Sequence, residues 1–270
     1  MMYTKDNHTF VVCAYKESPY LEECVMSLMG QTVPSHVIMS TSTDNAYIRG
    51  IAEKYGLELY VNQSTEKGIA ADWNFAYHQA QTPLVTLAHQ DDRYDAHYVE
   101  NMLSYVNRAK DPVIYFANYH EIRNGEVVAT STMLKVKRLL LRPLLSPRNW
   151  GKIRKKRAAL RYGNPIACWS VCYVRARLPE TVFVSNFKSN LDWEEWEKLS
   201  RLVGDFVYSP DIMTYHRVHE GSETSHTIRE GNIRGQEDYA MFLRFWPAWI
   251  AKLLMRFYIR GQHYNVPENI

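Results

Sequence analysis

The stretch from Leu84 to Asp95 reads LVTLAHQDDRYD, an apolar run that ends in two adjacent carboxylates, Asp91 and Asp92. Short runs rich in Leu, Val and Thr are typical of buried strands in a parallel sheet. In an open α/β sheet, ligands bind at the carboxyl ends of the strands, which is where this acid pair falls. Divalent cations such as Mg²⁺ bind proteins through one or two carboxylates together with phosphate oxygens. The pair therefore predicts a cation site, with a solvated turn or a helix N-cap as the alternative.

Strand and helix patterns alternate around this stretch. Three β-rich runs precede it, FVVCAY (10–15), HVIMST (36–41) and LELYV (57–61), and a fourth strand starts at Pro83. The helical patterns between and after them open at Ser18–Pro19, Asp44, Gly68 and Asp95. Strands separated by such helices imply parallel βαβ units with right-handed crossovers. With further strands at 113–119 and 125–130, the predicted fold is α/β, with a mixed, mainly parallel central sheet flanked by helices.

The second half of the chain has a different pattern. An apolar stretch covers 165–174, a Trp-rich acidic helix is expected over 191–203, and strands are expected at DFVYS (205–209) and IMTYHRV (212–218). The pattern from 229 to 260 is helical, with a break at Pro247. We therefore expect one main domain over 1–228 and a helical C-terminal extension over 229–270.

The composition excludes several classes of protein. The chain has 270 residues, of which 46% are hydrophobic, and no run of about 18 apolar residues that would predict a membrane-spanning helix. The first ten residues lack the apolar core of a signal peptide. Four cysteines are too few for a disulfide framework, and Cys168 and Cys172 lack the further His or Cys that a zinc site needs. A cytoplasmic protein is the simplest expectation.

One segment carries most of the positive charge. Residues 131–162 hold eleven basic residues and no acid, while the whole chain has 32 basic and 29 acidic residues, so the remainder has a net charge of −8. Polybasic elements bind anionic membranes at about 1 kcal/mol per Lys or Arg. The predicted C-terminal helix, with Trp and Phe beside Arg and Lys, suits the same surface. The alternatives are a mobile loop over the active site for 131–162, and a packed helix or a contact in a homo-oligomer for the C-terminal helix. No nucleic-acid motif accompanies the charge, so nucleic acid is not an expected partner.

An ordered series of motifs over residues 8–225 resembles the family 2 inverting glycosyltransferases of the GT-A fold. VVCAYKESPYLEECVMSLMGQT (11–32) is similar to the first strand, loop and helix of that family, and KGIAADWNFAYHQA (67–80) to the helix that flanks the donor site. HQDDRY (89–94) stands where the family keeps its metal-binding acids. LDWEEWEKLSR (191–201) resembles the helix start that carries the catalytic base, and YHRVHEGSETS (215–225) the loop that closes over the diphosphate.

The resemblance has three departures. The second strand, which in the family ends in an acidic pair that reads uracil, ends here in Met39, Ser40 and Thr41. His89 stands in place of the first acid of the metal motif, and Trp73 in place of a frequent Arg. The nucleotide base of the donor is therefore left open among uridine, thymidine, guanosine and others.

The resemblance implies a role for particular residues in an inverting displacement. Asp192 is the expected catalytic base, with a helix N-cap as its alternative and Glu195 as the substitute base. The expected ligands of Mn²⁺ or Mg²⁺ are Asp91, Asp92 and His219, and the metal would neutralise the departing diphosphate. Arg217 is expected to bind that diphosphate through charge-assisted hydrogen bonds. His216 is expected to point to the opposite face of its strand and to be structural.

The other expected ligand contacts concern the donor and the acceptor. Residues expected at the nucleotide-sugar donor are Ala14, Tyr15, Glu17, Asp44, Lys67, Gly68, Asn74, Asp91 and Arg217. Tyr15, Asp44 and Lys67 are equally explained as residues of the fold. Trp169 and Trp193 are expected to form an acceptor platform, although Trp at helical spacing is also typical of a core.

The predicted function is metal-dependent transfer of a sugar from a nucleotide-diphosphate donor to an acceptor hydroxyl, on a glycan or lipid-linked glycan, in bacterial cell-surface polysaccharide assembly. Residues 1–120 would form the nucleotide-sugar half, and 121–228 the acceptor half with its basic insertion at 131–162. A peripheral position on the inner face of the cell membrane would follow from the basic segment. The alternatives are a non-catalytic nucleotide-sugar-binding protein and a nucleotidyltransferase, although the latter would be expected to carry a Gly-rich phosphate loop near the first strand, which is absent from the sequence.

Overall fold

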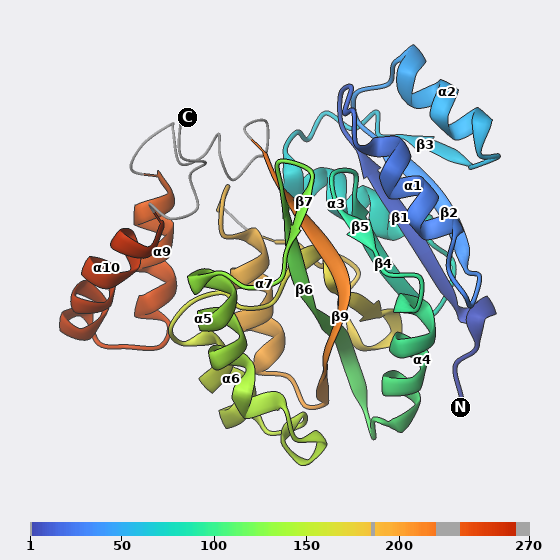
Figure 1. Cartoon of the computed structure of the whole chain (residues 1–270). Coiled ribbons are helices and arrows are strands. Elements are labelled where there is room, and N and C mark those ends of the chain that lie inside the picture. The colour runs from blue at the N-terminus through green and yellow to red at the C-terminus, as the bar shows by residue number, and fades with distance from the viewer. Residues whose placement is uncertain (1, 185–186, 220–232, 263–270) are drawn as a thin grey trace.

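The computed structural model describes residues 2–184, 187–219 and 233–262, without the side chains of residue 257 and residues 259–262 (Figure 1). In these residues nine strands form one sheet in the order β3-β2-β1-β4-β8-β6-β9-β5, and β7 pairs with β6. The sheet is mixed and flanked by helices, as the sequence predicted.

The first four strands are parallel, as the sequence predicted. They are β1 (His8–Ala14), β2 (His36–Thr41), β3 (Leu59–Val61) and β4 (Leu84–His89). The intervening helices are α1 (Leu21–Met29), α2 (Ala46–Lys54) and α3 (Ile69–Gln79). The order runs outward from β1 to β3 and then returns to β4, so right-handed crossovers place α3 on the opposite face from α1 and α2. All four carboxyl ends therefore meet at one edge.

Three helices begin later than the sequence indicated, because the expected first residues form turns. The helix expected from Ser18–Pro19 begins at Leu21. Asn45 rather than Asp44 caps α2, by accepting a hydrogen bond from the backbone N–H of Ile48 at 2.9 Å. The Asp95 carboxylate accepts from the backbone N–H of His97 at 3.0 Å, an Asx turn that delays α4 (Tyr98–Arg108) to Tyr98.

The remaining strands make the sheet mixed. They are β5 (Arg93–Tyr94), β6 (Pro112–Arg123), β7 (Glu126–Val128), β8 (Cys172–Val174) and β9 (Asp205–Val218). β8 lies antiparallel between β4 and β6, while β9 runs parallel to β6. The two strands expected near 205–209 and 212–218 are one strand with a register irregularity opposite Ala117–Tyr119, where Pro210 has no N–H to donate.

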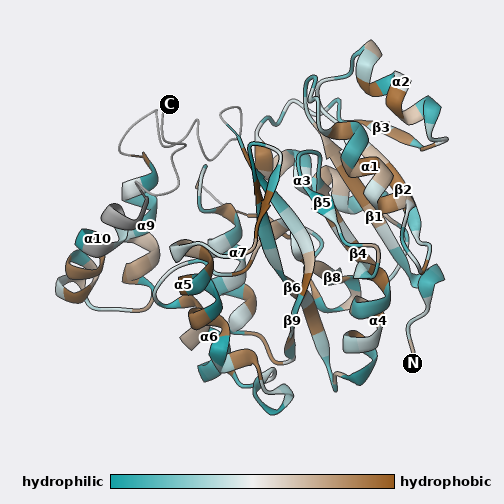
Figure 2. Ribbon diagram, in the orientation of Figure 1, coloured by the Kyte–Doolittle hydropathy of each residue, from teal (hydrophilic) through white to brown (hydrophobic). Residues whose placement is uncertain are grey.

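Helices occupy the rest of the second half. They are α5 (Thr132–Leu141), α6 (Ile153–Leu160), α7 (Leu191–Ser200), α9 (Ile233–Leu243) and α10 (Ala248–Gln262). The basic segment is α5 and α6 joined by short 3₁₀ turns, with Leu134, Leu144 and Trp150 buried. The expectation of a mobile loop at 131–162 is therefore wrong, because this segment buries enough apolar surface to pack as helices. Figure 2 shows hydrophilic and hydrophobic residues alternating along it.

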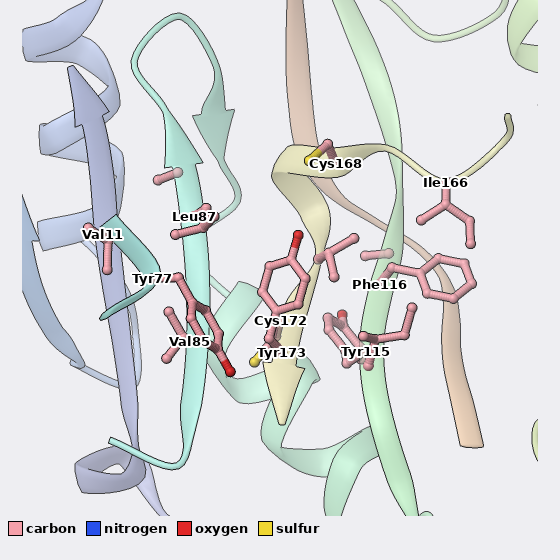
Figure 3. Packing of buried hydrophobic residues seen from close by; sticks show 14 of the residues in the cluster. Val11, Tyr77, Val85, Leu87, Tyr115, Phe116, Ile166, Cys168, Cys172 and Tyr173 are labelled. Atoms are coloured by element: carbon pink, nitrogen blue, oxygen red, sulfur yellow. The ribbon is translucent and has the colours of Figure 1, made fainter. Parts of the chain in front are cut away.

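The core lies along the central strands. Figure 2 shows β1 and β2 as largely hydrophobic, and Figure 3 shows Tyr77, Val85 and Tyr173 packed between β4 and β8. The rings of Tyr77 and Tyr173 meet edge to face at 6.0 Å between centroids. Among the helices of the described residues, none is long and apolar enough to cross a membrane.

The C-terminal extension is joined to the helix that carries Asp192. The Glu237 carboxylate on α9 accepts hydrogen bonds from the backbone N–H groups of Lys188, Ser189 and Asn190, at 2.7 to 3.0 Å. Asp238 accepts from the side-chain amide of Asn190 at 2.8 Å. The expected domain boundary at 228 falls in 220–232, outside the described residues, and it stays a prediction.

Candidate active site

The acid pair lies in the turn that follows β4, at the carboxyl edge of the sheet. Ser18, from the loop after β1, donates to Asp91 Oδ1 at 2.6 Å, and His219 Nε2 lies 3.3 Å from Asp91 Oδ2. Burial acts to raise the pKa of Asp91, but the hydrogen bonds from His219 and Ser18 outweigh it, and the pKa lies below its usual range. Asp91 is therefore held as a carboxylate, as a cation ligand must be.

Asp92 is the more deeply placed acid, with 3% of its surface exposed. Its Oδ1 accepts from the backbone N–H of Arg217 at 3.0 Å and lies 2.9 Å from His216 Nδ1. The expectation that His216 points away from the site is therefore wrong. The physical reason is the position of the end of β9 at Val218. His216, within the strand, contacts Asp92, and His219, just after the strand, contacts Asp91.

Arg217 connects several residues at the carboxyl edge of the sheet. Its side chain forms an ion pair with Glu23, donates to the Asp91 carbonyl at 3.2 Å, and lies over the Tyr20 ring at 4.2 Å. Only 8% of Arg217 is exposed. Its charge is therefore shared with Glu23, and its expected contact with a donor diphosphate stays a prediction.

The donor set fits a divalent cation only in part. Among the described residues, no three His, Cys, Asp or Glu side chains converge as a metal cluster would require. Two adjacent carboxylates suffice for Mg²⁺ or Mn²⁺ when phosphate and water oxygens complete the coordination sphere. Asp91 and Asp92 therefore fit a cation that arrives with a phosphate-bearing ligand, rather than a closed structural metal site.

The two unusual residues of the motifs are neighbours. Trp73 on α3 stacks on His89 at 5.0 Å between ring centroids, with an interplanar angle of 26°. Trp169, in the 3₁₀ turn Cys168–Ser170, stacks on His216 at 4.0 Å and 14°. At this half-buried position, stacked rings replace charged groups without leaving a charge unpaired. The departures at 73 and 89 are thus one coupled feature.

Asp192 lies in the first turn of α7, but it is not the N-cap, which is Asn190. Its oxygens accept from Asn164 Nδ2 at 2.6 Å and from the backbone N–H of Trp193 at 2.8 Å. Burial raises the pKa of Asp192 above its usual range, although these two hydrogen bonds and the charges of Lys137 and Arg234 oppose the shift. The carboxylate is therefore a better proton acceptor than an exposed Asp.

Asp92 and Asp192 share a buried neighbour, Cys168. The negative charges of Asp92 and Asp192 both act to raise the pKa of the Cys168 thiol, which is labelled in Figure 3. A chain of contacts joins the two sites: Lys137, which interacts with Asp192, donates to the Tyr119 hydroxyl at 2.8 Å, and the Tyr119 ring meets Trp169 at 5.3 Å. Lys137 and Tyr119 were not predicted, because no local pattern marks either of them.

The expected donor residues separate into two groups. Ala14, Tyr15 and Glu17 follow β1, and the backbone N–H and C=O of Tyr15 are both bonded to the Gln90 side chain at 2.9 Å. Tyr15, Glu17, Lys67 and Gly68 are exposed at this edge, while Asp44 is paired with Arg49. Asn74 is instead committed to the backbone of Phe183, which it contacts at 2.8 and 2.9 Å. Asn74 therefore positions the 183 region.

A carboxylate that the sequence reasoning missed lies where the second strand lacks its acids. Asp72 on α3 accepts from Ser42 Oγ at 2.7 Å and from Asn62 Nδ2 at 2.9 Å, just beyond the ends of β2 and β3. Its position next to Trp73 was the available signal. The edge therefore keeps a half-buried acid, supplied by a helix instead of a strand.

The expectation that Trp193 contacts the acceptor is wrong. Trp193 has 0% of its surface exposed and donates its indole N–H to the Leu160 carbonyl at 3.1 Å, so it is a core residue that no acceptor reaches. Trp169 is half-buried beside His216.

Glu195, the expected substitute base, is buried, and this burial raises its pKa to about 7 although Lys198 lies 2.7 Å from its carboxylate.

The fold and this edge together define a GT-A type of glycosyltransferase architecture. The family model described as Glycosyl transferase family 2 matches residues 9–183, and the chain belongs to this family. No curated protein gives a significant match to the chain.

Solved structures agree on the fold. S. aureus TarS (residues 1–349) in complex with UDP-GlcNAc has a TM-score of 0.64 and 16% identity, covering 92% of this chain and 70% of TarS. The mannosyltransferase PcManGT from Pyrobaculum calidifontis, in complex with GDP-Man and Mn²⁺, has a TM-score of 0.59 and 16% identity, covering 94% of this chain and 70% of that protein.

Proposed function

We propose that the protein is a metal-dependent inverting glycosyltransferase, which moves a sugar from a nucleotide-diphosphate donor to an acceptor hydroxyl. One observation carries this proposal: Asp92 and Asp192 both lie within the electrostatic reach of Cys168, and contacts through Trp169 connect His216, the partner of Asp92, with Tyr119. Inverting displacement needs a leaving-group site and a base on the two sides of the anomeric carbon. The acid pair and Asp192 supply two such separate sites.

In this mechanism Asp192 accepts the proton of the acceptor hydroxyl as that oxygen attacks. Asn164 and the Trp193 N–H fix the orientation of its carboxylate, and Lys137 favours the ionised form that a base requires. A divalent cation held by Asp91 and Asp92 would neutralise charge on the departing nucleoside diphosphate. His216, His219 and Ser18 hold these two acids in place.

The donor would lie along the carboxyl edge of β1 to β4, against Ala14, Tyr15 and Glu17. The two structural neighbours were solved with UDP-GlcNAc and with GDP-Man, so both bases are candidates here. Asp72 can accept a hydrogen bond from a base N–H, which both uracil and guanine present.

The acceptor side would begin at Trp169, whose half-buried ring adjoins the acid pair through His216. We propose a glycan or lipid-linked glycan acceptor, used in bacterial cell-surface polysaccharide assembly. Such an acceptor would place the protein in the cytoplasm, on the inner face of the membrane.

Contact with that membrane has support from α10. Its exposed residues Trp249, Lys252, Leu253 and Arg256 have the spacing of one helical face, which mixes aromatic, apolar and basic side chains. Such a face suits the surface of an anionic bilayer. Flotation with anionic liposomes tests this, and failure to bind at low salt would contradict it. The same face could instead join two copies of the chain, which sedimentation would detect.

The decisive experiment is a thermal-shift panel of nucleoside diphosphates and their sugars, with and without Mn²⁺. A ligand that binds the native state raises the melting temperature according to its occupancy, so the donor is identified by the largest shift. The stabilising donor is then tested for turnover with wild-type protein. Stabilisation without hydrolysis or transfer would favour a non-catalytic nucleotide-sugar-binding protein, which the loss of an acid at His89 makes the second candidate.

A further inference from the structure

Three basic side chains of α5 and the turn after it line one hollow, away from the acid pair. Lys135, Arg138 and Arg142 face a cavity of about 420 Å³ that α5 forms with β6 and β9. Their spacing of three and then four residues places them in one row along the helix. We infer that this hollow binds a phosphate-bearing anion.

The hollow is built from fixed elements. Arg138 donates to the carbonyl oxygens of Tyr119 and Ala129 at 3.2 and 3.1 Å, which holds its guanidinium against β6. Asn118 and Tyr208 line the strand side. Tyr208 is buried, and its phenol hydroxyl is protonated at neutral pH. The cavity thus presents a guanidinium whose orientation is already set.

The charges around the hollow require a counter-ion. Like charges three or four residues apart repel one another on a helix. No acidic residue lines this cavity among the described residues. Asp211, whose charge reaches Tyr208, is bonded to Asn101 Nδ2 at 2.9 Å and Ser209 Oγ at 3.2 Å and does not line the hollow. A bound anion would relieve the repulsion among the three basic side chains that do line it.

The geometry favours a phosphate group with room for more than one phosphoryl unit. The exposed Arg142 can offer its guanidinium fork to two phosphate oxygens, while Arg138, whose Nη2 and Nε already donate to the protein, and Lys135 add positive charge. Leu139 and Leu145, which are 57% and 50% exposed, border the hollow with apolar surface. The phosphate could therefore be free in solution or belong to a lipid headgroup, and the shared chemistry is the phosphate itself. The site does not depend on the proposed transfer reaction.

The test compares two double variants of the full-length chain. K135A/R142A removes two exposed charges from the hollow, while R154A/K155A removes two exposed charges from α6, in the same basic segment. Binding of inorganic pyrophosphate is measured by calorimetry in EDTA, which leaves no metal to hold phosphate at the acid pair. Vesicles of phosphatidylglycerol, with phosphatidylcholine as the control, form the second arm.

We expect K135A/R142A to weaken binding by about tenfold or more, because two charge-assisted contacts are lost, and R154A/K155A to stay within about twofold of wild type. Selective loss with pyrophosphate assigns a site for free phosphate, and selective loss with phosphatidylglycerol vesicles alone assigns a lipid headgroup. Equal losses of binding in the two variants would mean that the basic segment attracts anions through its overall charge and not at this hollow, and would overturn the inference. The absence of binding by wild-type protein in both arms would overturn it as well. Neither result bears on sugar transfer, which is measured separately.

Discussion

Asp91 and Asp192 are both carboxylates of the candidate site, yet their surroundings shift their pKa values in opposite directions. Asp91 receives hydrogen bonds from Ser18 and His219 that lower its pKa, whereas burial in α7 raises the pKa of Asp192. Carboxylates whose environments separate their pKa values are suited to different tasks. The surroundings of Asp91 therefore suit the binding of a cation, and those of Asp192 suit the acceptance of a proton.

The largest expected effect comes from removing the proton acceptor. D192N keeps the size of the side chain but cannot act as a base, so we expect transfer to fall by about a thousandfold or more. Nucleotide binding in the presence of Mn²⁺, measured by thermal shift, should be unchanged. Near-normal turnover in this variant would break the comparison and refute the assignment of the base.

The second effect concerns the other region. D91N removes a charge that a cation would bind, so we expect the Mn²⁺-dependent part of the nucleotide thermal shift to disappear. Asp92 is the less suitable target, since it also accepts from Arg217 and His216. Retention of the full Mn²⁺-dependent shift in D91N would show that this acid is not a metal ligand.

A third prediction separates Asp192 from Glu195, one of three buried glutamates of α7. Burial raises the pKa of Glu195 from 4.5 to about 7, so between these values the native state binds more protons than the unfolded state. Stability should therefore fall as the pH rises from 4.5 to 7, by about 1.4 kcal/mol per unit of pKa shift. E195Q should lose this dependence in urea unfolding at a series of pH values. If E195Q kept the wild-type dependence of stability on pH, another group would be responsible for it.

The smallest effect concerns Lys137, which links the two regions. Its charge favours ionised Asp192, so K137M should raise the pKa of that base and move the acid limb of the kcat/KM profile to higher pH, by about one unit. Asn164, Arg234, Cys168, Tyr173 and Tyr258 also interact with Asp192 and stay in place. K137R should restore the wild-type profile. A lower rate without a shifted limb would mean that Lys137 has only a structural role.

Some features of the site followed from local pattern alone. The apolar run LVTLAH and the polar tip after it placed Asp91 and Asp92 at the end of β4, because ligands bind at the carboxyl ends of the strands in parallel sheets. Asp192 was found through the resemblance of its helix start. Both depended on residues close together in the chain.

Other features could not follow from local pattern. His216 lies 124 residues from Asp92 in the sequence, and its direction depends on where β9 ends against the turn after β4. Trp193 and Trp169 have the same residue type, but only the packing of α7 decides that one is buried and the other half-exposed. Asp72 replaces the missing acids of β2 only because α3 crosses the ends of β2 and β3.

The sequence by itself determined the order of strands and helices, the mainly parallel sheet, and the presence of acids at its carboxyl edge. These properties come from side-chain periodicity and from turns within a few residues, which each segment carries alone. Only the tertiary structure decided which acids are desolvated, which histidines hold them, and that Lys137 reaches Asp192. Burial and long-range contacts are properties of the packed chain, because they depend on segments that lie far apart in the sequence, as His216 lies 124 residues from Asp92.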